Sequence, residues 1–190
     1  IVLHLAAQPL VRESYKAPIA TYSTNVMGTV HVLEASRRTK SVRAVINVTT
    51  DKCYENREWV WGYRENEPIG GHDPYSSSKG CSELVSAAYR KSFFEDAEIQ
   101  VATARAGNVI GGGDWKKNRI IPDILKSITQ NKTLYLRHPN SVRPWLHVLD
   151  CLNGYLIATE HSFKGINTFN SWNFAPNLTN QITVYELVKI

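Results

Sequence analysis

Short apolar runs alternate along this chain with longer segments in which hydrophobic residues recur three and four positions apart. The short runs predict buried strands, and the longer segments predict amphipathic helices. The predicted strands are residues 1–5, 44–49, 99–104 and 133–136, and the predicted helices are residues 18–38, 74–94, 118–130 and 148–160. Strands that alternate with helices favour an α/β fold built on a doubly wound parallel sheet.

Two segments depart from this alternation. Residues 54–72 contain tryptophans, tyrosines and glycines with little periodicity. They are expected to form a long loop, which either covers a site or lies on the surface without a functional role. Near the end of the chain, Thr183 and Glu186 have the spacing of a capping box, which predicts the start of a last helix.

The helix at residues 74–94 begins with a strong start signal. Asp73 is a typical N-cap residue, and Pro74 suits the first helical position. Tyr75 then falls in the first turn, with Lys79 one turn later on the same face. A free phenol has a pKa of about 10, so its use as a base near neutral pH needs a neighbouring cation. Tyr75 and Lys79 are therefore a candidate proton-transfer pair.

The Tyr-x-x-x-Lys spacing occurs twice, because Tyr185 and Lys189 share it, and the spacing alone is weak evidence. Context favours the first pair. The buried strand at residues 44–49 runs into the polar residues Thr50, Asp51 and Lys52, which supply a hydroxyl, a carboxylate and an amine. Nothing upstream of the second pair resembles such a strand end.

Composition narrows the class of protein. The chain has 190 residues, 43% of them hydrophobic and 21% charged, which is typical of a globular protein with a core. No apolar run approaches the roughly 20 residues needed to cross a bilayer, and no leader opens the chain. The three cysteines are unpatterned and the histidines lack metal-ligand spacing. We therefore expect free thiols, a cytoplasmic location and no metal site.

The net charge does not indicate a nucleic-acid partner. The net charge is +5, but the basic residues are dispersed and form no continuous stripe of the kind that nucleic acid requires. The basic groups at residues 116–119 and 137–143 are short. One or two arginines in such groups can neutralise a diphosphate through bidentate hydrogen bonds.

Taken in order, these motifs resemble the extended short-chain dehydrogenase/reductase family, and within it the nucleotide-sugar dehydratases and epimerases. The motifs that carry the resemblance are Leu5-Ala6-Ala7-Gln8, Asn25-Val26-Met27-Gly28-Thr29, the pair Tyr75 and Lys79, Asn108, Val142-Arg143-Pro144-Trp145-Leu146-His147-Val148 and Trp172-Asn173-Phe174-Ala175. Asp51-Lys52 is similar to the residue pair of 4,6-dehydratases, whereas 4-epimerases usually carry small hydroxyl or apolar residues there.

The resemblance implies a Rossmann-type sheet with a small substrate-binding lobe, and tightly bound NAD as the cofactor. It implies a hydro-lyase that dehydrates a nucleotide sugar, with CDP-glucose as the expected substrate and a deoxysugar for lipopolysaccharide O-antigen biosynthesis as the expected use. A homodimer through the two long helices is expected, with neither nucleic acid nor membrane as a partner. A UDP-amino-sugar 4,6-dehydratase, a 4-epimerase and a non-catalytic binding module remain the alternatives.

The resemblance also implies catalytic roles. Tyr75 would remove the proton of the sugar 4-hydroxyl, while Lys79 holds the nicotinamide ribose and lowers the phenol pKa. Thr50 would hydrogen-bond the same hydroxyl. Asp51 would be the acid for the elimination of water. Lys52 occupies the position of the base, which is Glu in the dTDP-glucose enzymes, and a lysine needs a pKa lowered from about 10.4 to act in this way.

Binding roles follow from the same resemblance. The implied cofactor contacts are Leu5, Ala6, Ala7, Asn25, Val48, Thr49, Tyr75, Lys79 and Ala106, and the implied substrate contacts are Asn108, Arg119, Arg143 and Asn173. Two of these residues have an equally good structural interpretation. Asn25 could form a hydrogen bond between a helix and a loop, and Asn173 could cap a strand end.

The expected domain organisation is incomplete. Residues 1–110 are predicted to be the C-terminal portion of an NAD-binding domain, and residues 111–190 largely a substrate lobe interleaved with it. No glycine-rich turn precedes the first strand, and Gly111-Gly112-Gly113 follows the wrong strand to replace it. We therefore expect a fragment that lacks the first βα unit and the end of the substrate lobe.

Overall fold

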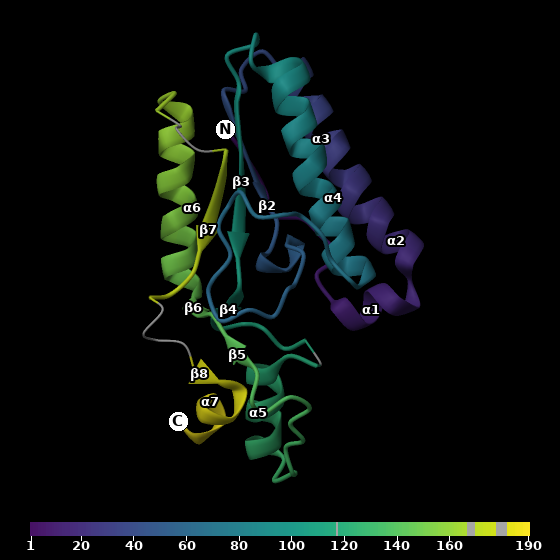
Figure 1. Ribbon diagram of the computed structural model, residues 1–190, viewed down its shortest axis with the longest axis vertical. Coiled ribbons are helices and arrows are strands. Elements are labelled where there is room, and N and C mark those ends of the chain that lie inside the picture. The colour runs from purple at the N-terminus through teal and green to yellow at the C-terminus, as the bar shows by residue number, and fades with distance from the viewer. Residues whose placement is uncertain (117, 167–169, 178–181) are drawn as a thin grey trace. The chain divides into compact units, whose positions relative to one another are not determined.

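The computed structural model describes residues 1–116, 118–166, 170–177 and 182–190, and it divides into two compact units (Figure 1). Unit 1 consists of Ile1–Ala106 and Asn153–Phe174, and unit 2 of Gly107–Leu152 and Ala175–Ile190. The chain thus passes from unit 1 to unit 2, returns to unit 1, and ends in unit 2. The assignment of a cofactor to residues 1–110 and of a substrate to residues 111–190 stays a prediction.

Unit 1 is built on a four-stranded parallel sheet. In spatial order the strands are β1 (Val2–His4), β2 (Ala44–Val48), β3 (Gln100–Ala106) and β7 (Ser171–Phe174). Residues Ala44 to Ile46 of β2 have no exposed surface, as expected for a strand covered on both faces. The parallel pairing brings the carboxyl ends of the strands to one edge of the sheet.

Helices cover both faces of this sheet, which confirms the predicted α/β fold (Figure 1). On one face lie α2 (Pro18–Tyr22), α3 (Gly28–Arg38) and α4 (Pro74–Tyr89). A π-helical turn at Ser23–Met27 joins α2 to α3, and another at Arg90–Phe94 extends α4. The other face is covered by α6 (Val148–Phe163). The long predicted helices at residues 18–38, 74–94 and 148–160 are therefore confirmed.

The core of unit 1 lies between the sheet and the face that carries α3 and α4. Its buried members are Leu33, Val45, Phe94, Ile99 and Val101. The seam between α2–α3 and α4 is different, because it is lined by small hydroxyl-bearing side chains. Thr21 donates to Ala17 O at 2.9 Å and Ser86 to Ser82 O at 2.8 Å, so each hydroxyl is satisfied within its own helix. Small, satisfied side chains let the helices pack closely.

Unit 2 consists of short elements. β4 (Asn108–Ile110) pairs in parallel with β6 (Trp145–His147), and β5 (Val142–Arg143) pairs antiparallel with β8 (Ile182–Thr183). α5 (Ile120–Thr129) confirms the helix predicted at residues 118–130. α7 (Val184–Lys189) begins with the predicted capping box, in which Thr183 N donates to Glu186 Oε2 at 2.7 Å.

One predicted element is wrong. Residues 133–136, all of which the structure describes, form no strand, and the side chain of Tyr135 is 85% exposed. Their alternating pattern lacks a neighbouring strand to pair with in the described part of unit 2. The pattern also did not predict α1 (Val11–Lys16) or the two- and three-residue strands of unit 2. Elements this short carry too few residues to show a period.

Among the described helices, none has the length and apolar character needed to span a membrane. The three cysteines are free thiols, with Cys53 and Cys151 buried and Cys81 half-buried.

Candidate active site

The site begins where β2 ends. Thr49 N donates to Ala104 O at 2.8 Å, which continues the pairing with β3 one residue beyond the strand. Thr50 follows in extended conformation, and its hydroxyl accepts a long hydrogen bond of 3.4 Å from Lys52 N. This contact caps a single 3-10 turn at Asp51–Cys53. The strand end therefore presents Thr50, Asp51 and Lys52 on one short, ordered turn.

The start of α4 lies beside this turn and follows the predicted pattern. Asp73 Oδ1 accepts from Ser76 N at 3.0 Å, and its Oδ2 accepts from Ser76 Oγ at 2.6 Å. Pro74 occupies the first turn, as predicted. Tyr75 and Lys79 are 9% and 6% exposed, so the face that carries both side chains is turned inward.

Lys79 joins the helix to the strand end. Its Nζ donates to Val48 O at 2.9 Å. Burial lowers the pKa of Lys79 to about 8, although the nearby Glu83 carboxylate opposes this shift. The pKa of His4, at the end of β1, is lowered first by burial and then by the charge of Lys79. A cation is thus held at the carboxyl edge of the sheet, one turn beyond Tyr75.

Asp51 and Lys52 form a pair with each other. Asp51 Oδ1 accepts from Lys52 Nζ and from Thr50 Oγ1, each at 3.0 Å. The side chains of Asp51 and Lys52 are 32% and 41% exposed, so solvent or a ligand can reach both. This arrangement is compatible with a pair of proton-transfer groups, and it is also the simple ion pair that a strand end can carry.

The residues expected to contact a cofactor follow the strands at this same edge. Leu5, Ala6 and Ala7 come after β1, Val48 and Thr49 end β2, and Ala106 ends β3. Open parallel sheets bind dinucleotides outside the carboxyl ends of their strands. Leu5 and Ala6 are exposed, and the small Ala side chains leave the backbone accessible. Of the three Lys79 donors, the described residues take one, so the local chemistry fits a nucleotide ribose.

The contacts of Asn25 agree with the structural interpretation, a hydrogen bond between a helix and a loop. Its Nδ2 donates to Ser78 Oγ at 2.9 Å and to Gln8 O at 3.1 Å, and its Oδ1 accepts from Gln8 N at 2.8 Å. The side chain therefore connects the π-helical turn at Ser23–Met27 both to the segment after β1 and to α4. Asn25 holds the backbone at Gln8, the residue after Ala7, and a direct contact with a cofactor stays a prediction.

Three of the predicted substrate residues lie in unit 2, whereas Tyr75 and Lys79 lie in unit 1. Asn108 begins β4, and its buried Oδ1 has no hydrogen-bond partner in the part of the chain that the structure describes. Arg119 precedes α5 and pairs with Asp114 at 2.6 Å. Arg143 is exposed on β5. The guanidinium groups of Arg119 and Arg143 can donate to an anionic ligand, whereas Asn108 Oδ1 can accept only from a donor such as a hydroxyl.

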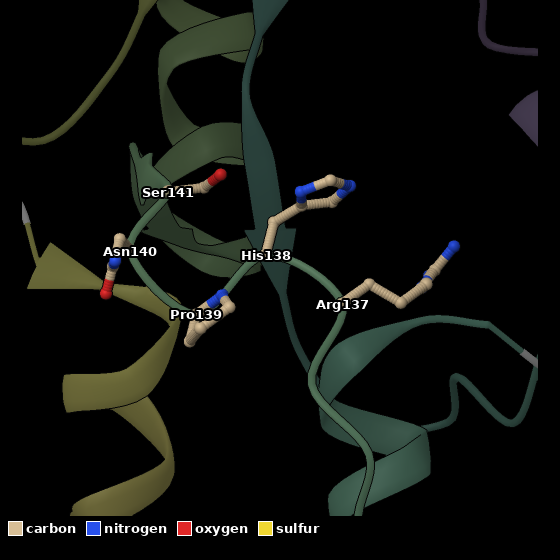
Figure 2. Close-up of a pocket in the computed structure, with 5 residues that line it drawn as sticks. All are labelled: Arg137, His138, Pro139, Asn140 and Ser141. Atoms are coloured by element: carbon tan, nitrogen blue, oxygen red, sulfur yellow. The ribbon is translucent and has the colours of Figure 1, made fainter.

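A pocket of about 340 Å³ lies in unit 2 just before β5. It is lined by Arg137, His138, Pro139, Asn140 and Ser141. Figure 2 shows Arg137 and His138 extending to the same side of their loop. This pocket falls within the basic group at residues 137–143, which sequence analysis associated with a diphosphate.

Sequence reasoning missed a buried ion pair in unit 1. Arg105 on β3 and Glu83 on α4 form two hydrogen bonds, of 2.9 and 2.7 Å, and both side chains are 4% exposed. Arg105 lies in a mostly buried strand, and a buried arginine needs a partner. The sequence therefore indicated that an acidic partner exists, but not which residue it is.

Asn173 also contacts protein groups. Its Oδ1 accepts from Tyr54 OH at 2.7 Å, and its Nδ2 donates to Tyr63 O at 2.9 Å. Both polar ends of the amide are thus bonded to the loop at residues 54–72. A direct contact of Asn173 with substrate stays a prediction.

Comparison with known proteins gives concordant matches. Residues 1–171 match the model of the NAD dependent epimerase/dehydratase family. The CDP-glucose 4,6-dehydratase of Salmonella typhimurium is 56% identical, across 99% of this chain and 54% of its own length. A dTDP-glucose 4,6-dehydratase of Streptomyces antibioticus is 30% identical, across 84% of this chain and 46% of its own length. The chain therefore spans about half the length of the curated relatives it matches.

Solved structures agree on the fold. The dTDP-glucose 4,6-dehydratase DesIV from Streptomyces venezuelae, solved with NAD, matches with a TM-score of 0.81 at 26% identity and covers 98% of this chain and 54% of that chain. The UDP-glucose 4-epimerase from Thermotoga maritima matches with a TM-score of 0.83 at 22% identity and covers 98% of this chain and 58% of that chain. At the lower identity the match supports the shared fold alone.

Proposed function

This chain belongs to the NAD dependent epimerase/dehydratase family, and from that premise we propose that it is part of a nucleotide-sugar 4,6-dehydratase that acts on CDP-glucose. The products would be CDP-4-dehydro-6-deoxyglucose and water. The observation that carries the proposal is the contact of 2.9 Å between Lys79 Nζ and Val48 O, which fixes the Tyr75 helix against the strand end that bears Asp51 and Lys52. The 56% identity with a CDP-glucose 4,6-dehydratase supports the choice of substrate.

The carboxyl edge of the sheet in unit 1 is the proposed place for NAD. Leu5, Ala6, Ala7, Asn25, Val48, Thr49, Tyr75, Lys79 and Ala106 are the residues proposed to hold or flank it. When bound, NAD supplies a hydride acceptor for the first step and the same hydride for the last, so no external reductant is consumed.

The first half of the proposed reaction is a proton transfer by Tyr75. Its phenolate takes the proton of the sugar 4-hydroxyl while Thr50 hydrogen-bonds the same oxygen. Lys79 stabilises the phenolate because its ammonium group is buried one helical turn away on the same face. The 4-ketone that results makes the proton on C5 acidic.

The second half uses Asp51 and Lys52. Lys52 is the base that takes the C5 proton and returns it to C5 in the final reduction, and Asp51 is the acid that gives a proton to the departing C6 hydroxyl, which leaves as water. Their mutual contact of 3.0 Å places the acid and the base on one turn. The two groups therefore sit close enough to act on adjacent carbon atoms of one sugar.

Substrate binding is proposed for unit 2 and for Asn173. Asn108, Arg119 and Arg143 would bind the nucleotide-sugar phosphates, with the neighbouring Arg137 adding positive charge. Arginine suits the planar, bidentate recognition of phosphate. The unpaired Asn108 Oδ1 is an acceptor and would take a donor such as a sugar hydroxyl.

We also propose that the full-length protein is a cytoplasmic homodimer that makes a deoxysugar nucleotide for lipopolysaccharide O-antigen. The dimer contact would be the outer face of α2–α3 and α4. Tyr22 and Leu84 support this proposal, because these large apolar side chains are 37% and 60% exposed on the outer face of the helices.

The test separates the two halves of the reaction in a full-length protein that carries this chain. Tyr75→Phe should abolish both halves. Asp51→Asn and Lys52→Ala should still permit oxidation at C4, and elimination should slow by about a hundredfold to ten thousandfold. Absorbance of the reduced nicotinamide should then persist after CDP-glucose is added.

Three results would contradict the proposal. One is turnover of CDP-glucose by Asp51→Asn or Lys52→Ala at the parental rate. Another is recovery of NADP in place of NAD from the denatured protein. The third is inversion at C4 of the sugar without loss of water, which would favour a 4-epimerase.

A further inference from the structure

One buried ion pair holds both ends of the turn that bears Asp51 and Lys52. At the near end, Thr49 Oγ1 donates to Glu83 Oε1 in a short hydrogen bond. At the far end, Tyr54 OH accepts from Arg105 Nη1 at 2.7 Å. Glu83 and Arg105 are themselves joined by two hydrogen bonds. The four residues Thr49, Glu83, Arg105 and Tyr54 are called the clamp below.

The clamp has few alternative arrangements, because every donor of the Arg105 guanidinium is used. Beyond Glu83 and Tyr54, Arg105 donates to Glu65 O at 2.9 Å and to Ser171 Oγ at 3.1 Å. The second carboxylate oxygen of Glu83 also accepts from Thr103 Oγ1 at 2.7 Å. A fully satisfied, buried network is rigid, since any shift leaves a polar group unpaired.

Stability alone does not account for this pair. Burying two charges costs desolvation free energy that roughly offsets their attraction, and apolar replacements are often as stable. The pair instead fixes the relative positions of α4, the end of β2 and the turn that follows it. It joins α4, one turn beyond Lys79, to the strand end and to the first residue after the Asp51–Cys53 turn.

We propose that Glu83, Arg105 and Tyr54 are positioning residues that hold the Asp51–Lys52 turn against the Tyr75–Lys79 helix, and that they serve the elimination step rather than the oxidation step. This inference rests on the proposed 4,6-dehydratase function. None of the three residues needs to touch the substrate, because each acts through the backbone of residues 49–54.

The clamp extends into the loop at residues 54–72. Tyr54 OH donates onward to Asn173, which donates to Tyr63 O, and the rings of Tyr54 and Tyr63 stack at 5.2 Å. Asn173 therefore connects Tyr54, next to the strand end, to Tyr63 in the outer part of the loop. Its two side-chain contacts make it a positioning residue as well.

Tyr54→Phe is the most direct variant, because it removes one hydroxyl and keeps the ring stacked on Tyr63. Tyr63→Phe is the matched control. It removes a hydroxyl from the other ring of the same stack, and among the described residues that hydroxyl hydrogen-bonds Arg57 N and Asn56 Oδ1 in the outer loop, not the clamp. Both variants would be made in a full-length protein that carries this chain and retains its nucleotide.

Two readouts are expected to change in Tyr54→Phe and not in Tyr63→Phe. Elimination should slow by about tenfold to a hundredfold while oxidation at C4 keeps its rate, so reduced nicotinamide accumulates during turnover. Amide hydrogen exchange over residues 49–55 should speed up in the absence of substrate, while strand residues 44–47 stay protected.

The proposal fails if Tyr54→Phe slows both half-reactions equally, if it leaves elimination at the parental rate, or if exchange over residues 49–55 is unchanged. A parental protein that never dehydrates CDP-glucose would instead contradict the proposed function, and the exchange measurement would still report on the clamp. Arg105→Lys provides a second variant, because it keeps the charge opposite Glu83 but cannot reach Tyr54 with the same fork of donors.

Discussion

Lys79, a proposed catalytic residue, is buried at a cost to the stability of the fold. The residue is 6% exposed, and burial lowers its pKa from 10.5 to about 8. One hydrogen bond to Val48 O partly compensates the lost hydration. Groups with shifted pKa values concentrate at active sites. An apolar side chain at a purely structural position would stabilise the fold more than a buried lysine does.

This burial predicts a stability that depends on pH. Between pH 8 and 10.5 the unfolded chain keeps a proton on Lys79 that the folded chain has lost, so the free energy of unfolding should rise with pH across this range. Lys79→Met lacks that dependence. Its stability relative to the parental protein should be greatest below pH 8 and should decline towards pH 10.5, as measured by urea unfolding of the nucleotide-free protein.

Lys132→Met, which removes one exposed positive charge, is the control for an effect of net charge. A constant difference between Lys79→Met and the parental protein from pH 8 to 10.5 would mean that Lys79 does not titrate in this range.

At this scale the sequence predicted the residues with strong local signals. Asp73 caps α4 and Tyr75 and Lys79 share a buried face, because capping and helical spacing act within a few residues. The Glu83–Arg105 pair was not predicted, since it joins positions that only the packed sheet brings together. The second role of Asn173 depends on a partner 119 positions away, Tyr54.

At the scale of elements, the capped first turn of α4 fixes the position of Tyr75. Asp73 satisfies the backbone N–H and the hydroxyl of Ser76, and Pro74 supplies a backbone already set for a helix. The wrongly predicted strand at residues 133–136 shows the opposite case. The residues at a helix end specify that end locally, whereas a strand forms only if another strand pairs with it. The residues of the strand do not show whether such a partner lies beside it in the fold.

Asp73→Ala should therefore lower the free energy of unfolding by about 1 kcal/mol, because the cap and its hydrogen bonds are lost. Asp73→Ser should restore most of this loss, since a serine hydroxyl can accept from Ser76 N. Urea unfolding of the two variants and the parental protein would measure the difference. Equal stability of Asp73→Ala and Asp73→Ser would indicate that the cap does not hold the first turn in solution.

At the scale of the molecule, unit 1 carries an apolar outer face on α2–α3 and α4. Ile19, Tyr22 and Leu84 are 85%, 37% and 60% exposed. The opposite face of the sheet carries α6, on which Leu156 is also 60% exposed (Figure 1). Two leucines of equal exposure on different faces allow the proposed dimer contact to be distinguished from general surface hydrophobicity.

Leu84→Arg should convert a full-length dimer to a monomer, because a buried contact would then contain an unpaired charge on each side of a two-fold axis. Leu156→Arg is the matched control and should leave the mass unchanged. Light scattering at micromolar concentration would measure both. A parental protein that is already monomeric, or a dimer that survives Leu84→Arg, would contradict the proposed interface.

The sheet of unit 1 has a consequence for how this polypeptide can be handled. Within the described residues, β1 pairs only with β2, so its other side presents unpaired backbone groups beside the exposed Leu3 and Leu5. An open edge of this kind templates the addition of another strand. Produced alone, the polypeptide is expected to aggregate along that edge, and a separately supplied strand of suitable register is expected to pair with it.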